Sequence, residues 1–270
     1  MTEQQDIDQK KIERMKRRIK KILDRANHTG QSKEEAEAAA ALAHELMAQY
    51  QIEEADLRDA AGEQQPEDIV QHTVLIPNPG NTGRQRRAAF EQIAMAYGGV
   101  TVAWREPDDN GSTAHYTIVA FMPASTAEFL ELMWPAMVLQ AEGMLAQDAK
   151  GEREYLSGAW RTQKEINREM ARFRRDWWVG WGQRTAAKIR SVRAKAFDEA
   201  RGTGSGELVL LSDHERSKAA RDKRFTKLRT AKGPKIQSGA GLNAGLVAGM
   251  RTLIGQTELA DQGAMSGLGG

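Results

Sequence analysis

Residues 173–190 read FRRDWWVGWGQRTAAKIR, which places three tryptophans and five arginines or lysines within about five helical turns. In a helix, Phe173, Trp177 and Trp181 share one side, the spacing of a face buried in a core. Burying a tryptophan of about 200 Å² contributes up to ~5 kcal/mol, whereas stacking on one base contributes about 1–3 kcal/mol. We therefore predict that this face lies in the core.

Trp178 lies about 100° from that face, beside Arg174 and Arg175. An aromatic ring flanked by cations is typical of a surface on which nucleic-acid bases stack. These three residues are therefore the candidate nucleic-acid contacts of this helix, with Trp178 as the exposed ring.

The glycines of this stretch indicate a close contact between helices. Glycine costs about 1 kcal/mol relative to alanine inside a helix, so Gly180 and Gly182 need a packing reason. Near the C-terminus, Gly241, Gly245 and Gly249 recur every four residues. Small residues at this spacing let two helix backbones approach closely. We expect Gly180 to pack against this ridge, in a contact within the chain or between subunits.

Charge is segregated along the chain, although the net charge is only +2. Residues 10–25 carry nine lysines and arginines against two acidic residues, a balance of +7. Residues 26–150 carry seven against nineteen, a balance of −12, and residues 151–235 carry twenty-two against eleven, a balance of +11. This pattern indicates a polyanionic partner for the basic blocks, with pairing to the acidic middle as the alternative.

Two further basic surfaces are candidates for contact with phosphates. The candidates on the first helix, expected over residues 9–26, are Lys10, Arg14, Arg17, Arg18 and Lys21. The candidates in the C-terminal half are Arg221, Lys223, Arg224, Lys227 and Arg229. Such runs neutralise phosphates without reading bases, so we expect salt-sensitive and mostly sequence-neutral binding.

The periodicity of the chain predicts an α+β protein with five segments. They are a helical hairpin over 1–59, a linker over 60–68, an α+β module over 69–150, a basic helical region with one short strand over 151–257, and a disordered tail over 258–270. In the hairpin, Ser32 and Glu35 form a capping box at the start of an alanine-lined second helix.

The module has the order β-α-β-β-α, which predicts a small mixed or antiparallel sheet with helices on one face. Its expected elements are strands at 69–77, 100–106 and 114–122 and helices at 84–98 and 125–149, the last capped by Ser125. Asn110 and Gly111 predict a hairpin between the second and third strands.

Beyond the module the chain is mostly helical. A helical pattern covers 152–200, and ELVLL (207–211) predicts a short strand. SDHE (212–215) then fits the cap and first turn of the next helix. A last helix is expected over about 241–255.

The N-terminal pattern KRRIKKILDRANHTGQSKEEAEAAAALAHELMAQYQI (16–52) resembles the N-terminal module of the family called domain of unknown function 2786. The rest of the chain resembles the region that commonly follows this module. The resemblance implies a phage or prophage origin, and hence the cytoplasm of a bacterial host. It also implies roles in nucleic-acid handling or in counteracting the host, and it carries no catalytic residues to transfer.

Catalytic, metal and cofactor motifs are missing from the sequence. There is no cysteine, which excludes disulfides, thiolate metal sites and a cysteine nucleophile, and the five histidines show no metal-ligand spacing. GTGSG (202–206) precedes a predicted strand instead of following one, so it fits no nucleotide-binding loop. An enzyme acting on nucleic acid would rest on Asp108 and Asp109 alone, which fit a turn.

We therefore predict no catalytic residue, metal or cofactor, and no membrane span, since the apolar windows are too short. The leading hypothesis is a non-enzymatic accessory protein that binds nucleic acid through its basic helices. The alternative is a homo-oligomeric interaction factor that acts on a host or phage protein through its glycine-ridged helices.

Overall fold

The computed structural model describes five N-terminal positions (14, 17, 18, 21 and 22) and residues 67–252 with short gaps at 79–80, 108, 110, 112, 160, 201–205 and 231–232. The chain divides into two compact units, residues 1–50 with 253–270, and residues 51–252. None of the helices in the described part of the chain combines the length and the apolar character needed to cross a membrane.

Little of the predicted N-terminal hairpin falls within the described residues. The backbone is helical at Arg14, Arg17, Arg18 and Lys21, and all four side chains are exposed. Lys10, the rest of the hairpin, the linker up to residue 66 and the tail over 258–270 lie outside the described part.

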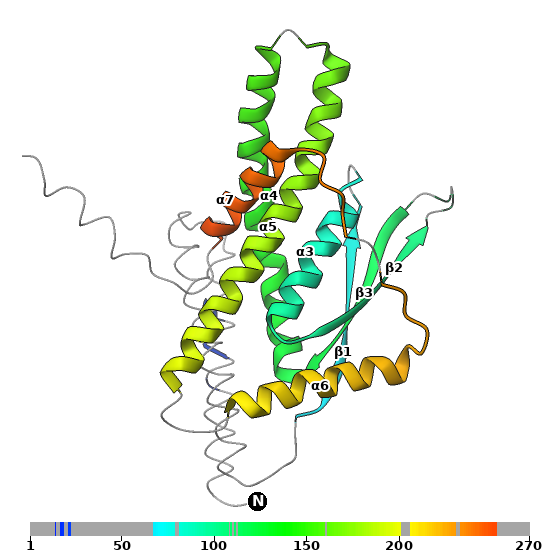
Figure 1. Ribbon diagram of the computed structural model, residues 1–270, viewed down its shortest axis with the longest axis vertical. Coiled ribbons are helices and arrows are strands. Elements are labelled where there is room, and N and C mark those ends of the chain that lie inside the picture. Colours follow the sequence, from blue (N-terminus) through cyan, green and yellow to red (C-terminus); the bar gives the residue numbers. More distant parts are fainter. Residues whose placement is uncertain are drawn as a thin grey trace, which may run out of the picture. The chain divides into compact units, whose positions relative to one another are not determined.

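The second unit contains an antiparallel sheet in the order β1-β3-β2 (Figure 1). Its strands are β1 (Ile69–Pro77), β2 (Val100–Pro107) and β3 (Thr113–Pro123). In the central strand, Ile118 pairs with Val74 of β1 and with Ala103 of β2. At the β2–β3 turn, Gly111 has φ +74°, a left-handed conformation that favours glycine. The sheet and its hairpin confirm the predicted α+β fold.

Helices cover both faces of this sheet, not one face as the sequence predicts. On one face, Arg87 of α3 (Gly83–Ala96) lies 5.7 Å from the ring of Tyr116. On the other, Phe225, just after α6 (Gly206–Arg224), lies 6.1 Å from Phe121. Tyr116 and Phe121 are five residues apart on β3 and so point to opposite faces. Figure 1 shows α6 crossing the strands near one end of the sheet.

α6 also replaces the short strand predicted at 207–211. The helix begins at Gly206 and continues through SDHE, so Asp213 is an interior residue and not part of a cap. The Asp213 carboxylate accepts a 2.9 Å hydrogen bond from Arg216 one turn later. A short apolar run is compatible with a strand or with a buried helix. Here residues 207–211 are helical because they are continuous with the helix that follows them.

The long helix α4 (Ala124–Ser157) begins differently from the prediction. Ser125 lies inside its first turn and does not cap it; the residue before the helix is Pro123. The carboxylate of Glu67 accepts hydrogen bonds from the Ser125 backbone N–H and, at 2.9 Å, from its hydroxyl. An acid from before β1 therefore satisfies a donor at the helix N-terminus, where negative charge is favourable.

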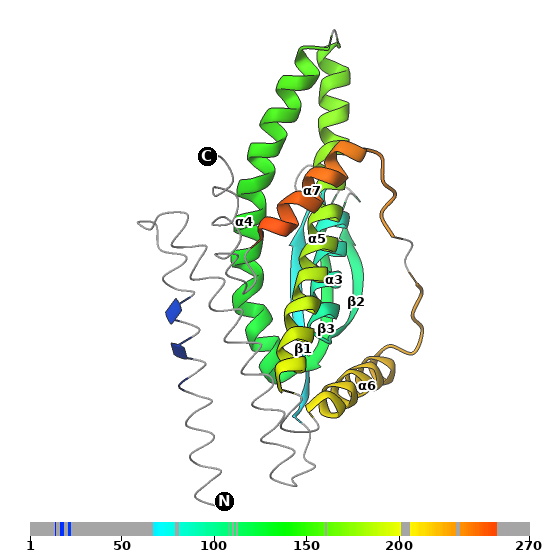
Figure 2. The same ribbon diagram turned by 60° about the vertical axis from the view of Figure 1, so that its left-hand side comes forward.

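The α+β module and the helical region share one core, whereas the sequence analysis separates them at residue 150. That position falls inside α4, which leads into α5 (Gln163–Ala200). α5 packs on α3 where Gly182 meets Ala89; a Cβ added at Gly182 would lie 2.5 Å from the Ala89 Cβ. α3 therefore lies between the sheet and α5 (Figure 2).

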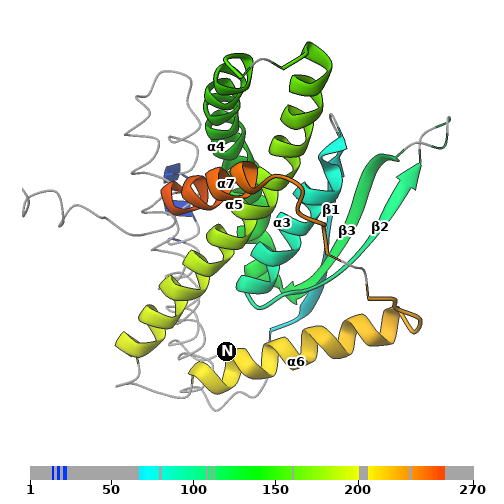
Figure 3. The ribbon, with the colours of Figure 1, turned by 45° about the horizontal axis from the view of Figure 1, so that its top comes forward.

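The glycine ridge packs against α5 within the same chain (Figure 3). It lies on α7 (Gly239–Arg251), where a Cβ at Gly245 would clash with the carbonyl oxygen of Trp177. Gly180 faces the carbonyl of Leu242 in the same way. Gly180 and Gly182 thus open opposite sides of α5 to two different helices.

The tryptophan cluster of α5 is the centre of this core. Phe173, Trp177 and Trp181 are buried, as their spacing predicts. The Trp177 indole donates a 2.7 Å hydrogen bond to Asp148, and the Trp181 indole donates a 2.8 Å hydrogen bond to the Thr252 hydroxyl. Both indole N–H groups therefore enter the core with a partner.

Candidate nucleic-acid interface

Trp178 is not the exposed ring that the sequence predicts. Its side chain is 0% exposed, because α3 covers the side of α5 on which it lies. The Arg86 guanidinium of α3 lies 4.5 Å from its ring centroid, and Arg86 also forms a 2.7 Å ion pair with Glu142. The face of the ring is thus occupied by a cation of the same chain, and no base can stack there.

Arg174 and Arg175 point to different places on the surface. Arg174 is exposed and lines a shallow hollow between α4 and α5 together with Lys150 and Arg153. Arg175 is half-buried and donates hydrogen bonds to the Ala171 carbonyl at 3.1 Å and to the Gln237 side chain at 3.3 Å. The two neighbours in sequence therefore cannot form one basic site.

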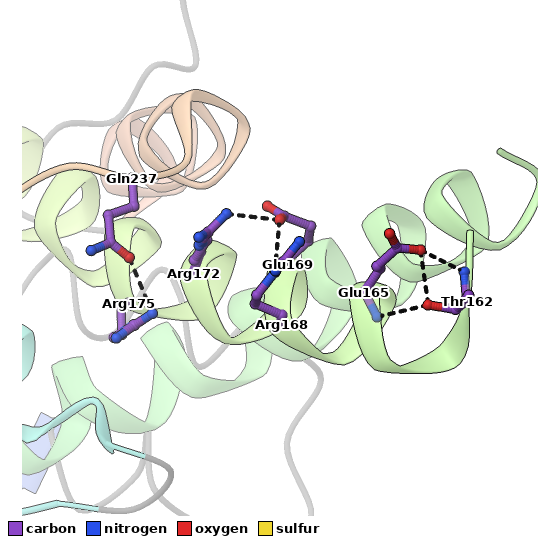
Figure 4. Close-up of polar contacts among 7 residues, drawn as sticks. All are labelled: Thr162, Glu165, Arg168, Glu169, Arg172, Arg175 and Gln237. Carbon is purple, nitrogen blue, oxygen red and sulfur yellow. Dashed lines mark hydrogen bonds and ion pairs between the residues drawn. The ribbon is translucent and has the colours of Figure 1, made fainter. Parts of the chain in front are cut away.

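Two cations on the outer face of α5 before Arg175 are already paired (Figure 4). Glu169 accepts a 2.8 Å bond from Arg172 and lies 3.7 Å from Arg168. At the helix start, the amide and hydroxyl of Thr162 donate to Glu165, which lowers the pKa of that carboxyl. This face thus carries cations with local acidic partners.

The last turn of α6 and the chain that follows it are different. We call residues 221–235 the basic segment; it contains seven lysines and arginines and one acidic residue, a balance of +6. Arg221 pairs with that acid, Asp222, at 2.7 Å. Four further cations are exposed and form no ion pair with any residue that the structure describes: Lys223, Arg224, Lys227 and Arg229.

Trp104 is a candidate that the sequence analysis missed. It is 39% exposed on β2, and its ring lies 6.3 Å from Phe225, the residue after Arg224. Its indole N–H donates to Glu106. The sequence did offer a signal: Trp104 lies in the second half of a strand that leads directly into a polar turn, where a side chain has fewer neighbours. The exposed aromatic ring beside the basic segment is therefore on the sheet and not on α5.

A polar cavity of about 430 Å³ lies where α3, β3, α5 and the end of the basic segment meet. Arg84, Arg175 and Lys235 supply positive charge to its wall, and Tyr116 supplies a ring. The wall also includes Gln85, which is only 8% exposed. The Oε1 atom of Gln85 finds no hydrogen-bond partner among the described residues. Spacing along the sequence gives no sign of this cavity, because its members come from four elements.

The described residues contain no group of three or more histidine, aspartate or glutamate side chains that could hold a metal ion. Asp109 is exposed and Asp108 lies outside the described part, so the hairpin carboxylates cannot be assessed as a pair.

The comparisons with known proteins add one finding. Residues 14–54 match the model of a family described as "Protein of unknown function (DUF2786)", the family that the N-terminal pattern resembles. No curated protein and no solved structure matches the chain.

Proposed function

We propose that this protein binds nucleic acid through phosphate contacts made by the basic segment, with little readout of base sequence. The observation that carries the proposal is the set of four exposed cations on either side of Phe225, none of them in an ion pair with a described residue. The ring of Phe225 lies 6.3 Å from the exposed ring of Trp104. Positive side chains following a backbone, with an aromatic ring beside them, are typical of sequence-neutral binding to single strands.

The alternative partner for these cations is the acidic middle of the chain. In the described part, no acidic residue of 26–150 pairs with Lys223, Arg224, Lys227 or Arg229. The cation of the preceding turn that does reach that region is Arg216, which donates to the Glu67 backbone carbonyl at 2.7 Å. Within the described part of the chain, these four cations are therefore available to a ligand.

The exposed cations of the N-terminal module, Arg14, Arg17, Arg18 and Lys21, offer a second phosphate-binding surface in the other unit. A phage or prophage origin, action in the cytoplasm of a bacterial host, and a host or phage protein partner remain predictions drawn from the family resemblance.

The homo-oligomer hypothesis has less support. Gly241, Gly245 and Gly249 are buried against α5 of the same chain, so they present no surface to a second copy. A contact between subunits would need a different face.

The experiment is a salt titration of binding to labelled single-stranded DNA, duplex DNA and RNA, read by fluorescence anisotropy. The test variant replaces Lys223, Arg224, Lys227 and Arg229 by glutamine. For single strands the slope of log K against log salt changes by about 0.7 per phosphate contact, so the variant should lose a slope of up to ~2.8.

The control variant replaces Arg161, Lys164, Arg168 and Arg172 by glutamine. It removes the same charge from the exposed start of α5, where Glu169 already serves two of the cations. Equal loss of affinity in both variants would mean that net charge alone drives binding, and the basic segment would lose its assignment. Wild-type protein that binds none of the three probes at low salt would refute the proposal.

A further inference from the structure

The polar cavity brings together three cations from three parts of the chain. Arg84 begins α3, Arg175 lies on α5, and Lys235 ends the basic segment. Arg84 donates a 3.3 Å hydrogen bond to the Gly233 carbonyl, and Arg175 donates one of the same length to Gln237. Arg175 also donates to the Ala171 carbonyl at 3.1 Å. A guanidinium carries five N–H donors, so these two bonds orient the Arg175 group and leave donors for a ligand.

The one carboxylate in the wall, that of Asp176, is engaged in hydrogen bonds to the backbone. Asp176 is 1% exposed, and its Oδ2 atom accepts hydrogen bonds from the backbone N–H groups of Gln237 and Ser238, the first at 2.6 Å. It fixes the entry of the chain into α7. With three cations against this one acid, the wall carries a balance of +2.

That balance selects among phosphate groups. A phosphate monoester carries about −1.5 to −2 at neutral pH, whereas an internal phosphodiester of a strand carries a single negative charge. Because the Coulomb attraction grows with the charge of the ligand, a wall with two excess positive charges fits the monoester better.

The base of the cavity supplies the polar contacts that such a ligand needs. Gln85 lies in the first turn of α3, more than nine-tenths buried, with its Oε1 unpartnered in the described structure. A buried polar atom without a partner is destabilising, and a hydrogen bond from a ligand hydroxyl would remove that cost. The Gly83 amide at the start of α3 already donates to Asn78 Oδ1 at 2.8 Å. What α3 offers an anion is therefore its helix dipole, which no acidic residue of the first turn offsets.

We propose that this cavity binds the terminal phosphate monoester of a nucleotide, with Arg84, Arg175 and Lys235 on the phosphate, Gln85 on a ligand hydroxyl and Tyr116 beside the sugar or base. A volume of about 430 Å³ lies within the usual range for small-molecule sites. The inference rests on the proposed function where the nucleotide is the 5′ end of a strand; a free mononucleotide carries the same group.

The test is calorimetric titration of the full chain with inorganic phosphate, adenosine 5′-monophosphate and adenosine. Wild type should bind the two phosphate-bearing probes and not adenosine. Arg175→Gln should weaken their binding at least tenfold, and so should Lys235→Gln, whose exposed position makes it harmless to the fold. Arg172→Gln is the matched control on the same helix, because Arg172 lies outside the cavity and pairs with Glu169.

A second arm compares 5′-phosphorylated with 5′-hydroxyl oligonucleotides of one sequence. Preference for the phosphorylated strand, lost in Arg175→Gln but kept in the variant of the four exposed cations, assigns the cavity to strand ends. Nucleotide binding without any oligonucleotide binding would support the cavity and refute the proposed function. Failure of wild type to bind phosphate or nucleotide, or equal binding by Arg172→Gln and Arg175→Gln, would overturn the cavity site while leaving the basic segment untouched.

Discussion

The contact of α5 with α7 and the basic segment both contain glycine, aromatic residues and cations, but the two regions use them differently. In the first region, glycines allow the two helix backbones to come into direct contact, and the tryptophans are buried beside that contact. In the second, Arg221 pairs with Asp222, whereas Lys223, Arg224, Lys227 and Arg229 are exposed and form no ion pair with a described residue. The difference teaches that neighbouring cations do not by themselves place an aromatic ring on the surface, because close glycine contacts bury the tryptophans of α5 among their arginines.

The largest effect should follow from filling the helix contact. In Gly245→Ala the new Cβ would clash with the Trp177 carbonyl, which belongs to a helix backbone and cannot turn away. We expect a loss of about 3 kcal/mol or more in the free energy of unfolding, measured by denaturant titration. Gly143→Ala is the control: it lies inside α4 with nothing within 4 Å, and it should gain about 0.5–1 kcal/mol. Equal stability of the two variants would refute the close packing.

The next effect concerns the anchor between the two regions. Asp176→Ala removes the acceptor of the Gln237 and Ser238 backbone N–H groups, and hydrogen bonds to a charged group contribute about 1.5–3 kcal/mol. We expect a loss of that size in a thermal or denaturant melt. Asp222→Ala, which removes an exposed ion pair of the basic segment, should change stability by less than about 1 kcal/mol. A larger loss in Asp222→Ala would reverse the roles assigned to the two carboxylates.

A smaller effect separates two tryptophans of one cluster. Trp181→Phe loses the hydrogen bond to Thr252, whereas the Trp178 indole N–H has no partner within the described structure. Both variants lose similar volume, but Trp178→Phe also removes a buried unsatisfied donor. The free energy of unfolding should therefore be lower for Trp181→Phe than for Trp178→Phe by about 1–2 kcal/mol. Its dependence on denaturant concentration should be the same in the two variants. The opposite ranking would show that the cation over Trp178 matters more than its missing hydrogen bond.

The smallest effect on stability belongs to the basic segment. Replacing Lys223, Arg224, Lys227 and Arg229 by glutamine removes exposed charges without partners, so each change should stay within about 0.5 kcal/mol. The melting temperature should remain close to wild type while binding to nucleic acid is lost. A marked fall in melting temperature would show that this segment stabilises the fold, which would contradict the contrast drawn between it and the α5–α7 contact.

The sequence predicts the sheet well, because alternation along 69–77, 100–106 and 114–122 and the glycine of the turn are local signals. It also predicts the buried face of α5, whose period is helical. It does not predict that Trp178 is buried, because that depends on α3 reaching α5 through Gly182 and Ala89. Nor does it locate the cavity, since Arg84, Arg175 and Lys235 meet only through tertiary packing. The local periodicity of apolar residues predicts helices and strands. Whether a second face of a helix is buried depends on contacts with residues distant in sequence.

The bond from Trp181 to Thr252 spans 71 residues of chain, and this separation has a consequence for synthesis. At about 5–20 residues per second, α7 is made roughly 4–14 s after the tryptophans it covers. During that interval the nascent protein carries an uncovered aromatic face on α5. We expect this face to be the part of the growing chain that holdase chaperones recognise, and release to coincide with the arrival of Gly245 and Gly249.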